Sequence, residues 1–487
     1  MQRGQKHVLS HAAIYLVARG LPGIVAFLAI PLFTRLLEPA EYGRYALVIA
    51  TVATLNALLF QWLRLSLSRF LAAHTHDQAT LKSTLVTTAV LMIGAFGLVA
   101  ALAALLPPLA EWRAVILIGW AVLAAQSLFE LCCEYSRALL NPWQFMLLQL
   151  MRSGAAVGIG VLLIKAGFGW WGPVIGVAIG MALGVAYAGV RDWTDVRFRI
   201  DRVILKKLCR YGLPLSLTVA LAVVISVSDR FLIAWFMGED AAGLYAVAFD
   251  FTCQTLTLLM MAINLAVFPV AVQAYESHGA DAAKEQMRHN GSLLVAIGLP
   301  CVVGLTVLAP GVAYCFFGAD YRAAAAAIIP LIALGAFFEG MKAYHFDAAF
   351  QFVHRTMIQV WIVLLVAVVN IVVNLFVIPR WGIEGAAIVS AGAYLLSIGL
   401  TIAIGRRYFA LPLPIASCVR AGIGCVAMAV VLWPFRSSVS PASLAIQIAG
   451  GATLYGAVLI ATNFIGLRDV VLDRFARRAI PAAEVAA

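Results

Sequence analysis

Apolar runs of about 20 residues recur along the whole chain, separated by short polar segments. A helix needs about 20 apolar residues to cross a bilayer, whereas the strands of a membrane barrel alternate over about 10 residues. The pattern therefore predicts an all-α, polytopic membrane protein. It predicts about fourteen transmembrane helices, at residues 12–32, 44–62, 84–106, 113–131, 145–165, 171–190, 212–236, 244–270, 292–313, 324–344, 357–378, 383–404, 413–433 and 443–465.

The longest connection between predicted helices follows the sixth helix and extends from about Arg191 to Tyr211. We interpret it as a hinge between two six-helix bundles. On this interpretation, residues 1–211 form the N-terminal bundle and residues 212–410 form the C-terminal bundle. Residues 411–487 then hold two extra helices and a basic tail.

A short internal repeat supports this division. The sequence FTRLLEPAEYGRYALV follows the first predicted helix, and WFMGEDAAGLYAVA follows the seventh, so that G-x-Y-A recurs at Gly43–Ala46 and Gly243–Ala246. Six helices separate the two copies, so both halves enter the membrane from the same side. This spacing predicts a parallel repeat about an axis normal to the membrane, and not an inverted one.

The composition narrows the class of protein further. The 487 residues are 63% hydrophobic and 12% charged, with a mean hydropathy of +0.97. Soluble domains carry about twice that share of charge, so a soluble enzyme, a disordered protein and a secreted disulfide scaffold are excluded. The eight cysteines contain no C-x-x-C pair, and we interpret them as small packing residues.

The net charge of +11 could indicate nucleic-acid binding, but the positions of the cations indicate topology instead. Roughly three cations lie in predicted cytoplasmic segments for each one in a periplasmic segment, which follows the positive-inside rule. We therefore expect both termini in the cytoplasm, some contact with anionic lipid and no nucleic-acid partner. Five cations fall inside predicted spans and away from their ends, namely Arg19, Arg152, Arg230, Lys342 and Arg420.

No motif in the sequence indicates catalysis. GFGWWG at Gly167–Gly172 matches a dinucleotide-binding pattern but lies between two predicted membrane helices, without the required strand. His7 and His11 are four residues apart, but no third ligand accompanies them. The sequence also lacks a P-loop. We therefore expect no enzymatic activity, no metal and no cofactor, although coupling to a gradient of H⁺ or Na⁺ stays open.

Three stretches of the chain resemble a known family. IPLFTRLLEPAEYGRYALVIA resembles the opening of polysaccharide-biosynthesis membrane proteins, the lipid-linked oligosaccharide flippases of the multidrug/oligosaccharidyl-lipid/polysaccharide (MOP) exporter superfamily. FFGADYRAAAAAIIPLIALGAFFEG (Phe316–Gly340) and IPRWGIEGAAIVSAGAYLL (Ile378–Leu396) resemble their tenth helix and their eleventh-to-twelfth helix turn. The resemblance implies two six-helix bundles around a cavity that opens alternately to either side.

The resemblance also implies a cargo and partners. The cargo would be an undecaprenyl-pyrophosphate-linked oligosaccharide, flipped from the cytoplasmic to the periplasmic leaflet of the bacterial inner membrane for assembly of O-antigen or exopolysaccharide. The polymerase and glycosyltransferases of the same pathway would be its partners. None of the matching stretches identifies the sugar.

Charged residues at bilayer depth are the strongest functional signal in the sequence. A charge there costs at least about 2.5 kcal/mol, so it normally faces protein or a wet cavity. Arg19 and Arg152 lie about one third of the way along helices 1 and 5, both in the predicted cytoplasmic third of the membrane. Two guanidinium groups at one depth suit a pyrophosphate or an acidic sugar. Alternatively, each arginine extends to the lipid headgroups.

Three acids also lie in predicted spans and away from their ends, namely Asp229, Asp250 and Glu339, and they are candidates for binding a coupling ion. Glu339 and Lys342 are three residues apart on one helical face, so they could instead neutralise each other. Arg230 and Lys342 are further cargo candidates. Asn264, Asn370 and Asn374 could hydrogen-bond sugar hydroxyls or neighbouring helices.

Gly172, Gly176, Gly180 and Gly184 recur every fourth residue in the sixth predicted helix. Such a stripe lets another helix approach closely, either within one bundle or in a homodimer. We favour packing within the bundle and expect a monomer.

Three classes of function compete on the sequence alone. The first is a flippase, for a lipid-linked oligosaccharide or for a peptidoglycan precursor, and the second is a cation-coupled multidrug or metabolite antiporter of the same superfamily. A membrane glycosyltransferase or polymerase is a third class, but polymerases usually carry a large periplasmic loop, which is missing here. The excess of basic over acidic residues in the spans favours an anionic cargo.

Overall fold

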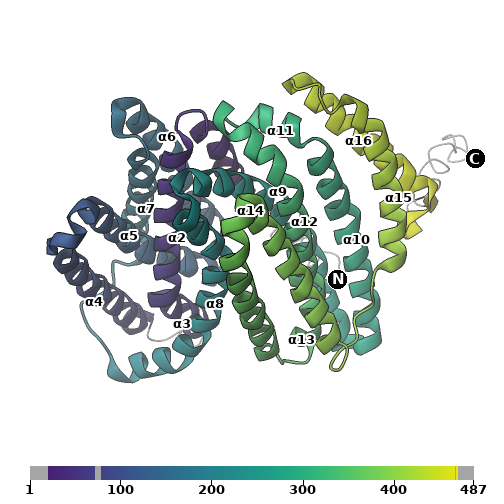
Figure 1. The fold of residues 1–487 in the computed structure, drawn as a ribbon. Coiled ribbons are helices and arrows are strands. Elements are labelled where there is room, and N and C mark those ends of the chain that lie inside the picture. Colours follow the sequence, from purple (N-terminus) through teal and green to yellow (C-terminus); the bar gives the residue numbers. More distant parts are fainter. Residues whose placement is uncertain (1–19, 72–77, 467, 470–487) are drawn as a thin grey trace, which may run out of the picture. The chain divides into compact units, whose positions relative to one another are not determined.

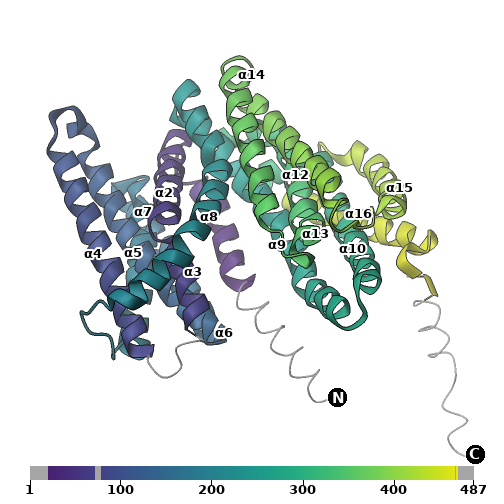
Figure 2. The same cartoon turned by 90° about the horizontal axis from the view of Figure 1, so that it is seen from below.

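The computed structural model describes residues 20–71, 78–466 and 468–469 (Figures 1 and 2). These residues form helices and no strands, in agreement with the predicted fold class. A helix at Gly20–Phe33 precedes α2 (Pro39–Leu59), α3 (Gln61–Phe70), α4 (Gln78–Leu105), α5 (Arg113–Ala138), α6 (Pro142–Leu163), α7 (Trp171–Asp192), α8 (Arg202–Met237), α9 (Glu239–His278), α10 (Ala280–Val307), α11 (Ala309–Phe316), α12 (Arg322–Met341), α13 (Ala348–Phe352), α14 (Met357–Gly405), α15 (Ile415–Leu432) and α16 (Pro441–Ala461).

Eleven helices of the described chain are long and apolar enough to cross a membrane, and α8 makes twelve if its two limbs, which meet at 50°, form one span. The 49 residues of α14 cover two of the predicted spans. At about 1.5 Å per residue they far exceed a bilayer of about 30 Å. The helix breaks at Gly382, whose φ of +60° strains any residue with a side chain. The number fourteen stays a prediction.

The first compact unit comprises the described residues up to Val247 together with Ile371–Ile383. Its central helix is α5, which contacts α2, α3, α4, α6 and α7 (Figure 2). The stripe of glycines on α7 lies against α6, where a Cβ on Gly180 would be 2.6 Å from the carbonyl oxygen of Met151. Packing of this stripe within the unit is therefore confirmed.

The second compact unit comprises Ala248–Asn370 and the described residues from Glu384 onwards. In this unit α10 packs against α12, α15 and α16, and α11 packs against α12 and α16 (Figure 1). The three domains predicted above, with boundaries at residues 211 and 410, stay a prediction.

The two copies of G-x-Y-A contact each other within the first unit, at the beginnings of α2 and α9. A Cβ added to Gly43 would lie 2.0 Å from the carbonyl oxygen of Glu239, and a Cβ added to Gly243 would lie 2.0 Å from that of Pro39. The Arg44 guanidinium also pairs with the Glu239 carboxylate at 2.5 Å. The reciprocal geometry is that expected of two repeat copies facing each other, and only glycine fits at either position. We call it the α2–α9 contact.

Candidate polar sites within the membrane-spanning helices

A buried polar cluster in the first unit joins three helices around Asp229 of α8. Asn374 of α14 donates from Nδ2 to Asp229 Oδ1 at 2.8 Å, and the Tyr245 hydroxyl of α9 donates to Oδ2 at 3.1 Å. The exposed fraction of Asp229 is 6%, and Asn374 and Tyr245 are more deeply buried. Arg230 follows on α8 and is partly buried. We call Asp229, Tyr245 and Asn374 the Asp229 cluster.

A carboxylate at this depth is stable only when polar groups surround it. In the Asp229 cluster the amide of Asn374 and the hydroxyl of Tyr245, both neutral donors, each bind one oxygen of the carboxylate. Such a group can take up a proton or a small cation, which is the chemistry expected of a coupling site. The sequence placed Asp229 and Asn374 among the candidates, but it gave no sign that residues 145 positions apart are hydrogen-bonded.

A second polar group, in the second unit, differs from the pairing considered in the sequence. Lys342 Nζ binds the two oxygens of Asp347 at 2.8 and 3.0 Å, and both side chains are largely buried. Glu339 lies within electrostatic range of Lys342 but accepts a hydrogen bond from Tyr394 of α14. The reason is a π-helical turn at Lys342–Phe346. This wider turn brings a residue five positions ahead beside Lys342.

The remaining candidates are distributed over both units. Asn370 Nδ2 lies 3.5 Å from the Ser390 hydroxyl, so it bridges the two limbs of α14. Asn264 and Asp250 are partly buried on α9, and the Asn264 Oδ1 atom accepts no hydrogen bond from the described residues. Arg420 is exposed and donates to the Asn463 carbonyl at 3.2 Å. Arg19 lies outside the described residues.

Arg152 of α6 is partly buried and lies within electrostatic range of Cys133 on α5. An ion-pair network that the sequence analysis missed lies close to Cys133. In it Arg64 of α3 contacts Glu130 at 3.0 Å and Glu134 at 3.9 Å, and Glu134 also pairs with Arg137. The spacing of Glu130, Glu134 and Arg137 in the sequence allows ion pairs between successive turns of one helix. The two acids lie at the predicted end of a span, however, and were not among the candidates.

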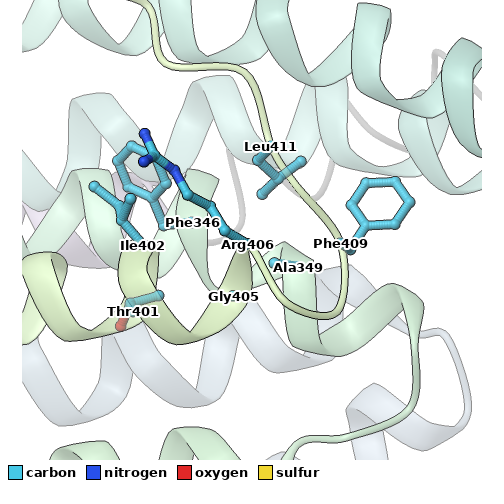
Figure 3. Close-up of a pocket in the computed structure, with 8 residues that line it drawn as sticks. All are labelled: Phe346, Ala349, Thr401, Ile402, Gly405, Arg406, Phe409 and Leu411. Atoms are coloured by element: carbon cyan, nitrogen blue, oxygen red, sulfur yellow. The ribbon is translucent and has the colours of Figure 1, made fainter.

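Three cavities of the described chain are lined mainly by apolar residues. One of about 420 Å³ lies between α2, α4 and α5, and one of about 470 Å³ lies between α10, α15 and α16. A smaller pocket follows the end of α14, and Arg406 is the only charged residue among the eight that line it (Figure 3). Among the described residues, no three His, Cys, Asp or Glu side chains are grouped to hold a metal.

Solved structures of known proteins share this architecture. The lipid II flippase MurJ, in an inward closed conformation, superposes with a TM-score of 0.79 at 13% identity, over 94% of this chain and 100% of that chain. An inward-facing multidrug resistance MATE family transporter of the MOP superfamily gives a TM-score of 0.62 at 16% identity, over 81% and 97%. At such identities the likeness concerns the fold. The protein is thus a polytopic membrane protein with the fold of MOP-superfamily transporters.

Sequence comparison identifies the family. A sequence model of the polysaccharide biosynthesis protein family matches residues 8–275, and one of the MatE family matches residues 214–376. Probable flippase AglR of Haloferax volcanii is 24% identical over 243 residues, which are 48% of this chain and half the length of that protein. Because the first match covers more than half of the chain, the chain belongs to the polysaccharide biosynthesis protein family.

Proposed function

We propose that this chain is a flippase that moves an isoprenoid-pyrophosphate-linked oligosaccharide from the cytoplasmic to the periplasmic leaflet. The family match over residues 8–275 carries the proposal. The description of AglR as a probable flippase and the transporter fold shared with MurJ and MATE proteins support it. The membrane would be the bacterial inner membrane, with both termini in the cytoplasm, and the product would enter assembly of O-antigen or exopolysaccharide.

The balance of charge in the spans favours this cargo over the cationic drugs of an antiporter. Apart from the two residues at each end of a span, five basic and three acidic residues fall in the predicted spans, and a basic cavity attracts anionic groups. A peptidoglycan precursor also carries a pyrophosphate, so the charge balance fits it equally well. The oligosaccharide is preferred because the family match is to polysaccharide biosynthesis.

We propose that transport proceeds by alternating access and that the α2–α9 contact is one closed end of the path. The contact lies at the predicted periplasmic ends of both helices. Two backbones without intervening side chains approach closely there, and close packing is the main force between helices in lipid. The contact has to part for release of cargo to the periplasm, while the Arg44–Glu239 pair holds it closed.

Asp229 is the proposed coupling residue. Asp229→Asn should leave membrane abundance unchanged, because the amide oxygen can still accept from Asn374 while the amide NH2 group donates to the Tyr245 hydroxyl, which reverses that hydrogen bond. Transport driven by a gradient of H⁺ or Na⁺ should fall at least about tenfold, since the group can no longer bind a cation or a proton. Initial rates in vesicles at varied pH and Na⁺ measure this effect.

Glu339→Gln is the control for Asp229→Asn, because it neutralises a carboxylate of another predicted span that also accepts a hydrogen bond from a tyrosine but is exposed, whereas Asp229 is buried. It should retain the ion dependence of the wild type. If Asp229→Asn transports with unchanged pH and Na⁺ dependence, Asp229 is a structural residue. If Glu339→Gln alone loses the dependence, coupling belongs to Glu339.

Recognition of the pyrophosphate is proposed to rest on Arg19, with Arg152 as a second contact. Cells that lack the chain should lose their surface polymer, and the wild-type chain should restore it. Arg19→Ala should fail to restore it at normal membrane abundance, because the cargo loses charge-assisted hydrogen bonds where bare charge is unstable. Arg19→Lys keeps the charge and should restore part of the polymer. Full export by Arg19→Ala would show that the arginine merely extends to the headgroups.

A further inference from the structure

The segment between α7 and α8 is fixed firmly onto the beginning of α4. The backbone N–H groups of Arg197, Arg199 and Asp201 donate to hydroxyl oxygens of α4, in order those of Ser83, Thr87 and Thr84, at 3.0, 3.2 and 3.1 Å. The three hydroxyl-bearing residues are buried. Every second residue from Arg197 to Asp201 is thereby bound through its backbone, so the main chain of this segment is fixed against α4.

The three acidic residues at this segment each bind a neighbouring group. Asp192 accepts a hydrogen bond from Gln144, and Asp195 forms an ion pair with the buried Lys82 at 2.5 Å. Asp201 caps α8 by accepting from the N–H groups of Val203 and Ile204 at 2.8 and 2.9 Å. The bond from Ile204 lowers the pKa of Asp201, with further help from Arg199 and Lys207. Asp201 therefore stays ionised at neutral pH, and its cap is lost only as the pH falls through this lowered pKa.

The cations of the same segment point to solvent. Six exposed basic side chains lie within fourteen residues, and none forms an ion pair with an acid of the described chain. We call them the connector patch: Arg197, Arg199, Arg202, Lys206, Lys207 and Arg210. Because the nearby acids Asp192, Asp195 and Asp201 are bound to other groups, the six cations give the patch an excess of positive charge.

Two exposed apolar side chains, those of Phe198 and Val203, lie between these cations in the sequence. Phe198 is 74% exposed and Val203 is 65% exposed. Exposed aromatic and aliphatic side chains between cations are typical of segments that lie in the headgroup layer of a membrane. The position in the fold agrees, because the patch adjoins the first turns of α4 and α8, and both helices are candidate membrane spans.

We propose that the connector patch is a binding surface for the phosphate headgroups of anionic phospholipids in the adjacent leaflet. Guanidinium groups bind phosphate oxygens in pairs, juxtamembrane cations are attracted to anionic leaflets, and Phe198 enters the headgroup layer beside them. The bound lipids would hold the connector at the membrane surface. The proposal does not depend on the identity of the cargo.

The test uses the full chain in detergent and counts bound lipids by native mass spectrometry. Phosphatidylglycerol should bind at least about tenfold more tightly than phosphatidylcholine, with a preference that falls as salt rises. Lys206→Gln/Lys207→Gln/Arg210→Gln should lose most of this preference. Arg197→Gln/Arg199→Gln is a second variant that keeps α8 intact and should also weaken it.

The control is Lys284→Gln/Arg288→Gln on α10, whose cations already pair with Asp281 and Glu285, and it should bind phosphatidylglycerol as the wild type does. Retention of the preference by both connector variants would overturn the proposal. So would complete displacement of phosphatidylglycerol by free inorganic pyrophosphate at low millimolar concentration, because the patch would then be a site for soluble phosphates.

Discussion

Gly43→Ala is expected to destabilise the protein by about 3 kcal/mol or more. The added Cβ would lie 2.0 Å from the Glu239 carbonyl oxygen and 3.1 Å from the Gly243 backbone nitrogen. Both atoms belong to the backbone of α9, so a rotation of a side chain cannot relieve the overlap. Either α9 moves away and the packing around Gly43 is lost, or the chain fails to accumulate. Thermal unfolding of the purified protein and its abundance in membranes measure the effect.

The matched control is Gly158→Ala, because Gly158 is a helical glycine of α6 with no atom within 4 Å of an added Cβ. This change should be neutral or stabilising by up to about 1 kcal/mol, as alanine favours helix. Gly243→Ala should resemble Gly43→Ala, and the double variant should cost less than the sum, since both changes open one contact. Equal stability of Gly43→Ala and Gly158→Ala would contradict the α2–α9 contact.

Lys342→Met is expected to cost about 3–5 kcal/mol, because it leaves the largely buried Asp347 carboxylate without its cation. Lys342→Met/Asp347→Leu removes both charges and should recover most of the loss, since an apolar pair of similar volume avoids the desolvation of two ions. Unfolding midpoints of the wild type and the three variants, including Asp347→Leu alone, form a double-mutant cycle that isolates the pair.

Transport by the double variant decides between two roles of Lys342. If the double variant is folded and still transports cargo, Lys342 is a structural partner of Asp347, which is the expected result. If it folds but does not transport, Lys342 contacts the cargo, as the sequence allowed. A single variant as stable as the wild type would mean that the ion pair contributes nothing.

Helices could be predicted from the sequence because each apolar run is a local property of about 20 residues. The positions at which a helix breaks or widens were harder to predict. Gly382 lies between two predicted spans, yet the helix resumes at once, so that one element of 49 residues covers both. The π-helical turn at Lys342–Phe346 has no comparable pattern, and therefore the pairing of Lys342 with Asp347 was missed.

The polar clusters could be predicted residue by residue but not as assemblies. A charge within an apolar run is conspicuous, which is why Asp229, Glu339 and Lys342 were chosen. Their partners come from other helices, as with Asn374 for Asp229 and Tyr394 for Glu339. Which helix faces meet depends on packing along whole helices. The repeated G-x-Y-A is the exception, because its two copies predicted a symmetry and the structure brings them into contact.

The central claim, that the chain moves a lipid-linked oligosaccharide across a bilayer, is tested most directly in vesicles that contain only the purified protein. The vesicles hold an isoprenoid-pyrophosphate-linked oligosaccharide with a fluorophore on the sugar, and a membrane-impermeant reductant quenches the fluorophores of the outer leaflet. Vesicles with the wild-type chain should lose the signal of both leaflets, whereas protein-free vesicles should keep that of the inner leaflet. Inner-leaflet signal that stays equally protected with the correctly folded chain would contradict the account.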